Sequence, residues 1–234
     1  MFPGFPPEAL KFLRALKRNN KREWFQARKE IFDTQVRAPM EQLVEAINAE
    51  LLKFAPEHIT DPKKAIYRIY RDTRFSPDKT PYKTHIAAIF PRRGLDRHTS
   101  AGFYFHLSPE ETGVASGLYG PGKEELLQVR RWIEQHHERF RKASRVQEKL
   151  LGKFHGDSLT RTPKGFDSKH PADDLVRMKS WVYWMELKPE LAETPKLLPE
   201  LIQRFRAAAP VVEMLNTPLK GRKAISLPAD RFEL

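Results

Sequence analysis

One stretch of the chain, YRIYRDTRFSPDKTPYKTH at residues 67–85, concentrates side chains that bind anions. Arginine binds phosphate or carboxylate through two parallel hydrogen bonds, and lysine adds a mobile point charge. Pro77 and Pro81 interrupt regular strand pairing, so a turn between them can bring the cations together. The sequence therefore predicts an anion-binding loop whose ligand-binding residues are Arg68, Arg71, Arg74, Lys79 and Lys83.

The same stretch carries two carboxylates, Asp72 and Asp78, which allow a second interpretation. These carboxylates can pair with the arginines and hold a long loop in place without any ligand. Structural ion-pair networks and functional sites have similar compositions. Both interpretations stay open at the level of sequence.

Two residues near the cations, Asp72 and His85, are candidates for proton transfer in catalysis. A general base must lie within hydrogen-bond reach of its substrate, and the sequence does not show that distance. The motifs GxxxxGK[ST], GxGxxG, HExxH and GxSxG are all absent from the chain. We accordingly predict no metal site and no cofactor.

Three functions fit these residues, and a module that binds a phosphate- or carboxylate-bearing ligand through the Arg/Lys-rich loop is preferred. The alternatives are a hydrolase acting on a phosphorylated or nucleic-acid substrate and a non-specific nucleic-acid binder. Tyr67, Tyr70, Phe75 and Tyr82 alternate with the cations, as stacking platforms do in proteins that bind single strands. Aromatic residues in strands more often belong to the core. The expected partner is an anionic small molecule or a nucleic acid.

Composition narrows the class of protein. The 234 residues include 42 Lys and Arg against 30 Asp and Glu, a net charge of +12 that attracts phosphates at long range. The absence of cysteine excludes disulfides, thiol nucleophiles and thiolate metal sites. The sequence contains no apolar run of bilayer length and no secretory signal at its start, which predicts a soluble cytoplasmic protein with no membrane partner. The sequence does not specify an oligomeric state.

Periodicity divides the chain into three regions. Residues 1–58 are predicted to be helical: Ala9, Phe12, Leu13 and Leu16 form one apolar stripe, Asn20 and Glu23 suggest a capping box, and a third helix starts near Pro39. Residues 63–120 are predicted to form the sheet, with strands at 65–71, 84–90, GFYFHL and VASGLYG. In GFYFHL the apolar residues Phe103, Phe105 and Leu107 share one face, opposite Tyr104 and His106.

The remainder, residues 121–234, is predicted to hold a helix at 123–143, a short helix near 172–178 and a strand at SWVYWMEL. A last helix at 196–216 is expected to be divided by Pro210. Together the regions predict a single α+β domain over 1–234, with a central, mostly antiparallel sheet flanked by N-terminal and C-terminal helices.

Four patches of the sequence occur in the order known from one protein family. They are FPPEALKFLRALKRNNKREWF, RIYRDTRFSPDKTPYKTH, GFYFHLSP followed by GLYGPGKEELLQVR, and PKGFDSKHPADDLVRMKSW. On these patches the chain resembles the bacterial and fungal family called domain of unknown function 2461. One departure is GLYGP, where Tyr119 lies close to the position of an expected tryptophan. The resemblance implies a single bacterial-type domain with a common fold, and it supplies no activity, ligand or catalytic residue.

Overall fold

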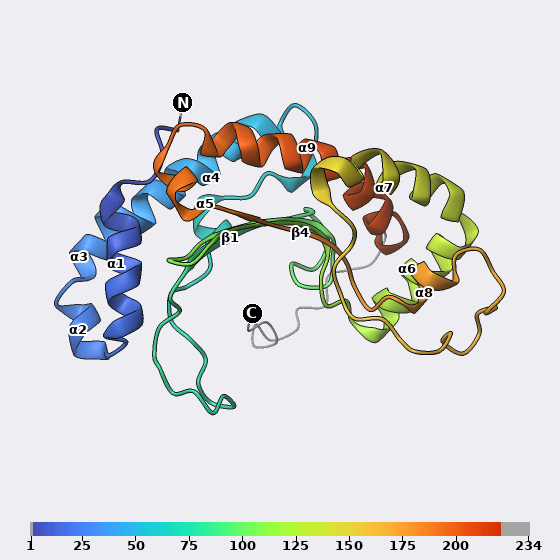
Figure 1. The fold of residues 1–234 in the computed structure, drawn as a ribbon, viewed down its shortest axis with the longest axis horizontal. Coiled ribbons are helices and arrows are strands. Elements are labelled where there is room, and N and C mark those ends of the chain that lie inside the picture. Colours follow the sequence, from blue (N-terminus) through green and yellow to red (C-terminus); the bar gives the residue numbers. More distant parts are fainter. Residues whose placement is uncertain (1, 221–234) are drawn as a thin grey trace.

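The sheet at the centre of the molecule contains four antiparallel strands arranged in chain order. The computed structural model describes residues 2–220. Its strands are β1 (Ile86–Pro91), β2 (Gly102–Leu107), β3 (Thr112–Leu118) and β4 (Trp181–Leu187). Helices precede and follow the strands (Figure 1), so the predicted α+β class is confirmed. The predicted domain limits at residues 1 and 234 lie outside the described residues.

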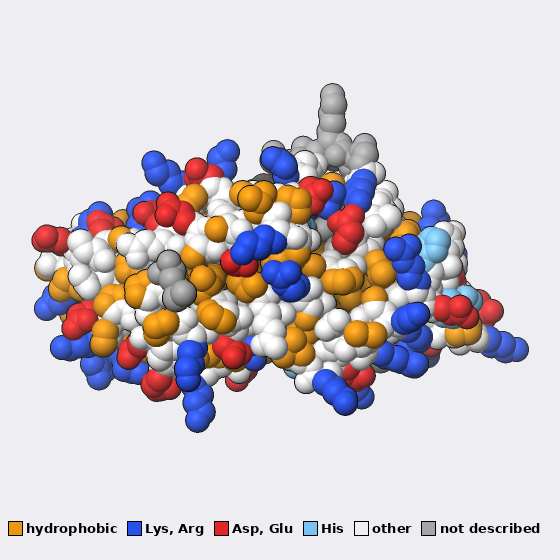
Figure 2. Space-filling view, turned by 90° about the horizontal axis from the view of Figure 1, so that it is seen from above, with side chains coloured by type: hydrophobic (Ala, Val, Ile, Leu, Met, Phe, Trp, Pro, Cys, Tyr) orange, Lys and Arg blue, Asp and Glu red, His pale blue; other side chains and the backbone are white. Residues whose placement is uncertain are grey.

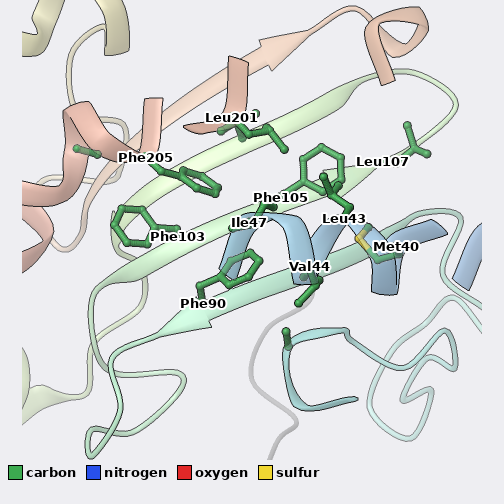
Figure 3. Close-up of a cluster of buried hydrophobic side chains, with 14 of the residues drawn as sticks. Met40, Leu43, Val44, Ile47, Phe90, Phe103, Phe105, Leu107, Leu201 and Phe205 are labelled. Atoms are coloured by element: carbon green, nitrogen blue, oxygen red, sulfur yellow. The ribbon is translucent and has the colours of Figure 1, made fainter. Parts of the chain in front are cut away.

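One face of the sheet carries the hydrophobic core. Two long helices, α4 (Ala38–Leu51) and α9 (Leu197–Asn216), lie over this face. Figure 3 shows side chains of both helices meeting those of the strands, and all of the labelled residues are fully buried: Met40, Leu43, Val44, Ile47, Phe90, Phe103, Phe105, Leu107, Leu201 and Phe205. Each such side chain contributes about 1.5–3 kcal/mol of hydrophobic stabilisation. The predicted alternation in β2 is thus confirmed.

The opposite face of the sheet is flanked rather than covered. At one end lie α1 (Pro7–Arg18), α2 (Arg22–Gln26) and α3 (Lys29–Ile31), and at the other end α6 (Lys123–Gln135), α7 (His137–Leu151) and α8 (Asp173–Arg177). Short helical elements complete the described chain: η1 (Phe32–Arg37), η2 (Pro56–His58), α5 (Pro62–Ala65), η3 (Pro189–Glu193) and η4 (Thr217–Leu219). The molecule is therefore shaped like an arch, with the sheet lying beneath α4 and α9 at its crown (Figure 1).

The predicted strand at residues 65–71 is wrong. Only single bridges form there, between Ile66 and Ala88 and between Tyr70 and Tyr82. The amide of Tyr67 donates to the carbonyl of Ala87 in β1, and the chain then leaves the sheet and descends below it (Figure 1). Residues 67–85 form a long hairpin-like loop, called here the basic hairpin. Its two prolines and five cations disfavour continued pairing with β1.

The capping box predicted at Asn20 is also wrong. The side chain of Asn20 bonds instead to the backbone of Tyr82, donating to its carbonyl at 2.8 Å and accepting from its amide at 3.1 Å. The residue at the N-cap of α2 is Lys21, and its side chain makes no capping bond. Asn20 thus joins the end of α1 to the base of the basic hairpin.

Two predictions about helix continuity are wrong: one predicted helix is broken, and one predicted break is absent. The predicted helix at 123–143 is broken at His136, whose φ of −123° leaves the helical region, so that α6 and α7 are separate. Pro210 does not divide α9, which continues through it to Asn216. Burial of Val211 and Val212 in the core offsets the hydrogen bond that proline removes. Among the described residues no helix combines the length and the apolar character needed to cross a bilayer.

Candidate functional site

A cleft of about 810 Å³ opens on the face of the sheet away from α4 and α9. Its floor consists of the strand residues that alternate with the core residues: Ala87, Ile89, Tyr104, Ala115, Gly117, Val182 and Trp184. Because side chains in a strand point alternately to opposite faces, the packing of the core also determines which residues line the cleft. Its volume is in the range typical of small-molecule sites.

Aromatic rings cover part of this floor. The rings of Tyr104 and Trp184 are nearly parallel, with centroids 6.5 Å apart and an interplanar angle of 28°. Both residues are partly exposed, and both lie opposite Ala115 in the strand register. Ala115 itself is buried, with 7% of its surface exposed. Tyr67 packs edge-on against Tyr104 at 6.4 Å and extends the row of rings toward the basic hairpin.

Four cationic side chains line the cleft: Lys17, Arg71, Lys83 and Arg97. The Arg97 guanidinium lies 4.4 Å from the centroid of the Tyr67 ring, and the Lys83 ammonium lies 5.2 Å from it. Arg97 donates hydrogen bonds to the carbonyl oxygens of Lys64 and Ala65, at 2.6 and 3.3 Å. Since carbonyls carry no net charge, these bonds orient the guanidinium without neutralising it.

Two arginines of the basic hairpin, Arg71 and Arg74, bond to its own carboxylates. Arg71 donates to Asp78 and, at 2.6 Å, to the hydroxyl of Thr80. Arg74 donates to both carboxylate oxygens of Asp72. A backbone hydrogen bond from Thr80 and the guanidinium of Arg71 lower the pKa of Asp78 to about 2. The internal ion pairs anticipated from the sequence are therefore present.

The structure does not bring all five predicted ligand-binding residues together. Arg71 and Lys83 line the cleft. Arg68 and Arg74 are exposed and do not line it. Lys79 is also exposed, and its ammonium group donates to the carbonyl of Thr73 at 2.8 Å. The five cations are thus divided between the cleft and the outer surface of the basic hairpin.

Of the two candidates for proton transfer, only His85 lines the cleft, whereas the carboxylate of Asp72 is bound by Arg74. The ring of His85 lies 5.4 Å from that of His106. Burial lowers the pKa of each histidine to about 4, and for His85 the neighbouring His106 and Lys83 contribute to the same direction. Both imidazoles are therefore neutral at pH 7 and can accept or donate a hydrogen bond.

A carboxylate lies behind His106. The Nε2 atom of His106 is 3.2 Å from Oε1 of Glu111. Burial and the neighbouring Glu186 raise the pKa of Glu111. These groups form a polar cluster at one end of the aromatic floor. The residues that the structure describes contain no group of three or more His, Cys, Asp or Glu side chains arranged to hold a metal ion.

Among the cleft residues that sequence reasoning missed are Lys17, Arg97, Tyr104 and Trp184. Arg97 lies in the connection between β1 and β2, which the sequence marked only as a loop. The alternation of β2 and β4 was the available signal, because in each strand an aromatic residue occupies the face opposite the core. Only the pairing of both strands with β3 shows that these two rings meet.

Comparison with known proteins identifies one family. The family model described as "Conserved hypothetical protein (DUF2461)" matches residues 8–214, which confirms the resemblance seen in the sequence. No curated protein and no solved structure matches the chain.

Proposed function

The chain belongs to the conserved hypothetical protein family DUF2461, and since that description names no activity, we propose a function from the cleft: the protein binds a small anionic ligand on the open face of its sheet. Lys83 and Arg97 are the main ligand-binding cations, supported by Arg71 and Lys17. The proposal keeps the anion-binding function expected from the sequence and moves its centre from the turn of the basic hairpin to its base.

The balance of charge in the cleft carries this proposal. Among the described residues that line it there are four cations, and the only carboxylate is that of Asp78. Two of the four cations pair with carboxylates, Arg71 with Asp78 and Lys17 with Glu110. The guanidinium of Arg97 and the ammonium of Lys83 both lie beside the ring of Tyr67. A concave site with low-dielectric walls concentrates such a field and attracts anions. An anion is the ligand that this arrangement favours.

The helical face of the molecule differs in its charge pattern. Figure 2 views the arch from above and shows Lys and Arg side chains interspersed with Asp and Glu, with hydrophobic side chains between them. A protein that binds nucleic acid through overall charge presents an extended basic surface. The mixed signs on this face favour a local anion site over a broad nucleic-acid surface there.

Isothermal titration calorimetry with inorganic phosphate and pyrophosphate tests the proposal. We expect Lys83→Ala and Arg97→Ala each to weaken binding by roughly 10-fold or more, since a charge-assisted hydrogen bond contributes about 1.5–3 kcal/mol. Arg74→Ala is the matched control, because it removes an arginine from the same hairpin but outside the cleft. Equal losses in Arg74→Ala and Lys83→Ala, or binding that survives in all three variants, would contradict the proposal.

A further inference from the structure

The arrangement of rings and charges in the cleft points to one class of ligand. We propose that the ligand is a nucleoside monophosphate, with its base against Tyr104 and Trp184 and its phosphate at Lys83 and Arg97. This inference rests on the proposed anion-binding function and adds the chemical class of the ligand.

The cleft is polarised from one end to the other. All four cations come from residues 17–97, that is, from the end of α1, the basic hairpin and the loop after β1. The opposite side is formed by β4 and the segments next to it, and within residues 2–220 it contributes no Lys or Arg to the lining; its lining residues include Tyr119, His155, Ser180 and Trp184. A ligand that fits this pattern has one anionic end and one uncharged end.

The uncharged end of the cleft suits a flat ring. Tyr104 and Trp184 lie on the floor with their rings nearly parallel, and Ala115 between them projects only a methyl group. The next residue of β3 on the same face of the sheet is Gly117, which has no side chain. Rings of this kind bind nucleic-acid bases by stacking, whichever base is present. Both rings line the cleft and are partly exposed, so a base can stack on the exposed face of Tyr104 or Trp184.

The row of rings links the two ends of the site. The ring of Tyr67 contacts the ring of Tyr104. The charged groups of Arg97 and Lys83 also lie against the ring of Tyr67. A phosphate bound by those cations and a base stacked on Tyr104 would therefore be separated by the ring of Tyr67. Because the cations gather at one end instead of following the row, the site matches one base with one phosphate group better than a strand with many phosphates.

Calorimetric comparison of adenosine 5′-monophosphate with ribose 5-phosphate isolates the contribution of the base. Both compounds carry the same phosphate group on a ribose, and only the first carries a flat ring. Stacking of one base on an aromatic side chain predicts that the nucleotide binds about 5- to 150-fold more tightly. Trp184→Ala should reduce this ratio, whereas Trp24→Ala should leave it unchanged because Trp24 lies outside the cleft.

Fluorescence supplies a second readout that does not depend on a destabilised variant. In the wild-type protein, stacking on Trp184 should quench tryptophan emission when the nucleotide is added and not when ribose 5-phosphate is added. Trp184→Phe keeps an aromatic ring, so it should retain most of the affinity while losing the quenching. Quenching that persists in Trp184→Phe would place the base elsewhere and overturn the assignment.

Comparing these ligands distinguishes an incorrect assignment of the base site from an incorrect assignment of the anion site. Equal affinity for the nucleotide and ribose 5-phosphate would overturn the base site while supporting anion binding. Absence of binding to inorganic phosphate, ribose 5-phosphate and the nucleotide alike would overturn both proposals. A ten-residue oligothymidylate that binds far more tightly than thymidine 5′-monophosphate would overturn the mononucleotide assignment in favour of a single strand.

Discussion

Gly113 lies directly opposite His106 in the β2–β3 ladder, and the absence of its side chain gives the imidazole its place. A Cβ atom at Gly113 would lie 2.2 Å from Cε1 and 2.6 Å from Nδ1 of that ring. The ring cannot move away easily, because it is 7% exposed and lies between Tyr104 and Trp184, with both ring centroids at 5.7 Å. We therefore predict that Gly113→Ala destabilises the protein through this one contact.

The magnitude follows from two opposing effects. Forcing a methyl group into a packed site costs about 1–3 kcal/mol. Without the clash, alanine in a strand is favoured over glycine by about 0.5–1 kcal/mol. In a His106→Ala background Gly113→Ala should therefore be neutral or stabilising, and the two substitutions should couple by about 1–3 kcal/mol, which is the cost of the clash. The sign of the Gly113→Ala effect should change between the two backgrounds.

Urea unfolding of the four proteins in this double-mutant cycle measures the coupling. In thermal scans, 1 kcal/mol corresponds to about 2–4 °C for a chain of this size. Gly102→Ala is the control: its Cβ would lie 2.6 Å from the backbone oxygen of Phe90, so His106→Ala should not rescue it. If Gly113→Ala costs the same with and without His106, the imidazole is not what requires glycine there.

Two further predictions concern stability. His85 and His106 have a pKa of about 4 in the folded protein against about 6.5 when unfolded, so the unfolded chain binds more protons between these values and stability falls as pH drops from 6.5 to 4. Urea unfolding at pH 7 and pH 5 should show this loss, of roughly 2 kcal/mol for His106 over this interval, and His106→Asn should reduce it. An unchanged pH dependence in that variant would contradict the assignment. Asn216 is fully buried and bonds both the amide and the carbonyl of Ala101, at 2.9 and 3.0 Å, so Asn216→Ala should cost about 2–5 kcal/mol in urea unfolding by leaving both groups unsatisfied. The exposed Asn19→Ala should change stability by less than about 0.5 kcal/mol, and similar losses in the two variants would refute the argument.

Local patterns in the sequence predicted most elements of the fold. The alternation of Phe103, Phe105 and Leu107 with polar neighbours identified β2 and its buried face, because a strand has a side-chain period of two. Patterns failed where distant groups competed with local ones. Asn20 was expected to cap its own helix, but it bonds to Tyr82, which lies 62 residues away.

The candidate site shows the same division. From the basic hairpin the sequence identified Arg71 and Lys83, because charge density is visible in a short window. It also contained Tyr104 and Trp184, but nothing in their neighbourhoods connects residues 80 positions apart.

The sequence alone determined properties of composition and of short stretches: an excess of cations near residue 70, the class of fold and the two faces of β2. The tertiary structure decided which cations are neutralised by Asp72 and Asp78 and which line the cleft beside aromatic rings. The physical reason is that charge and periodicity are properties of neighbouring residues. Enclosure of a ligand site depends instead on long-range strand pairing, which only the folded chain brings about.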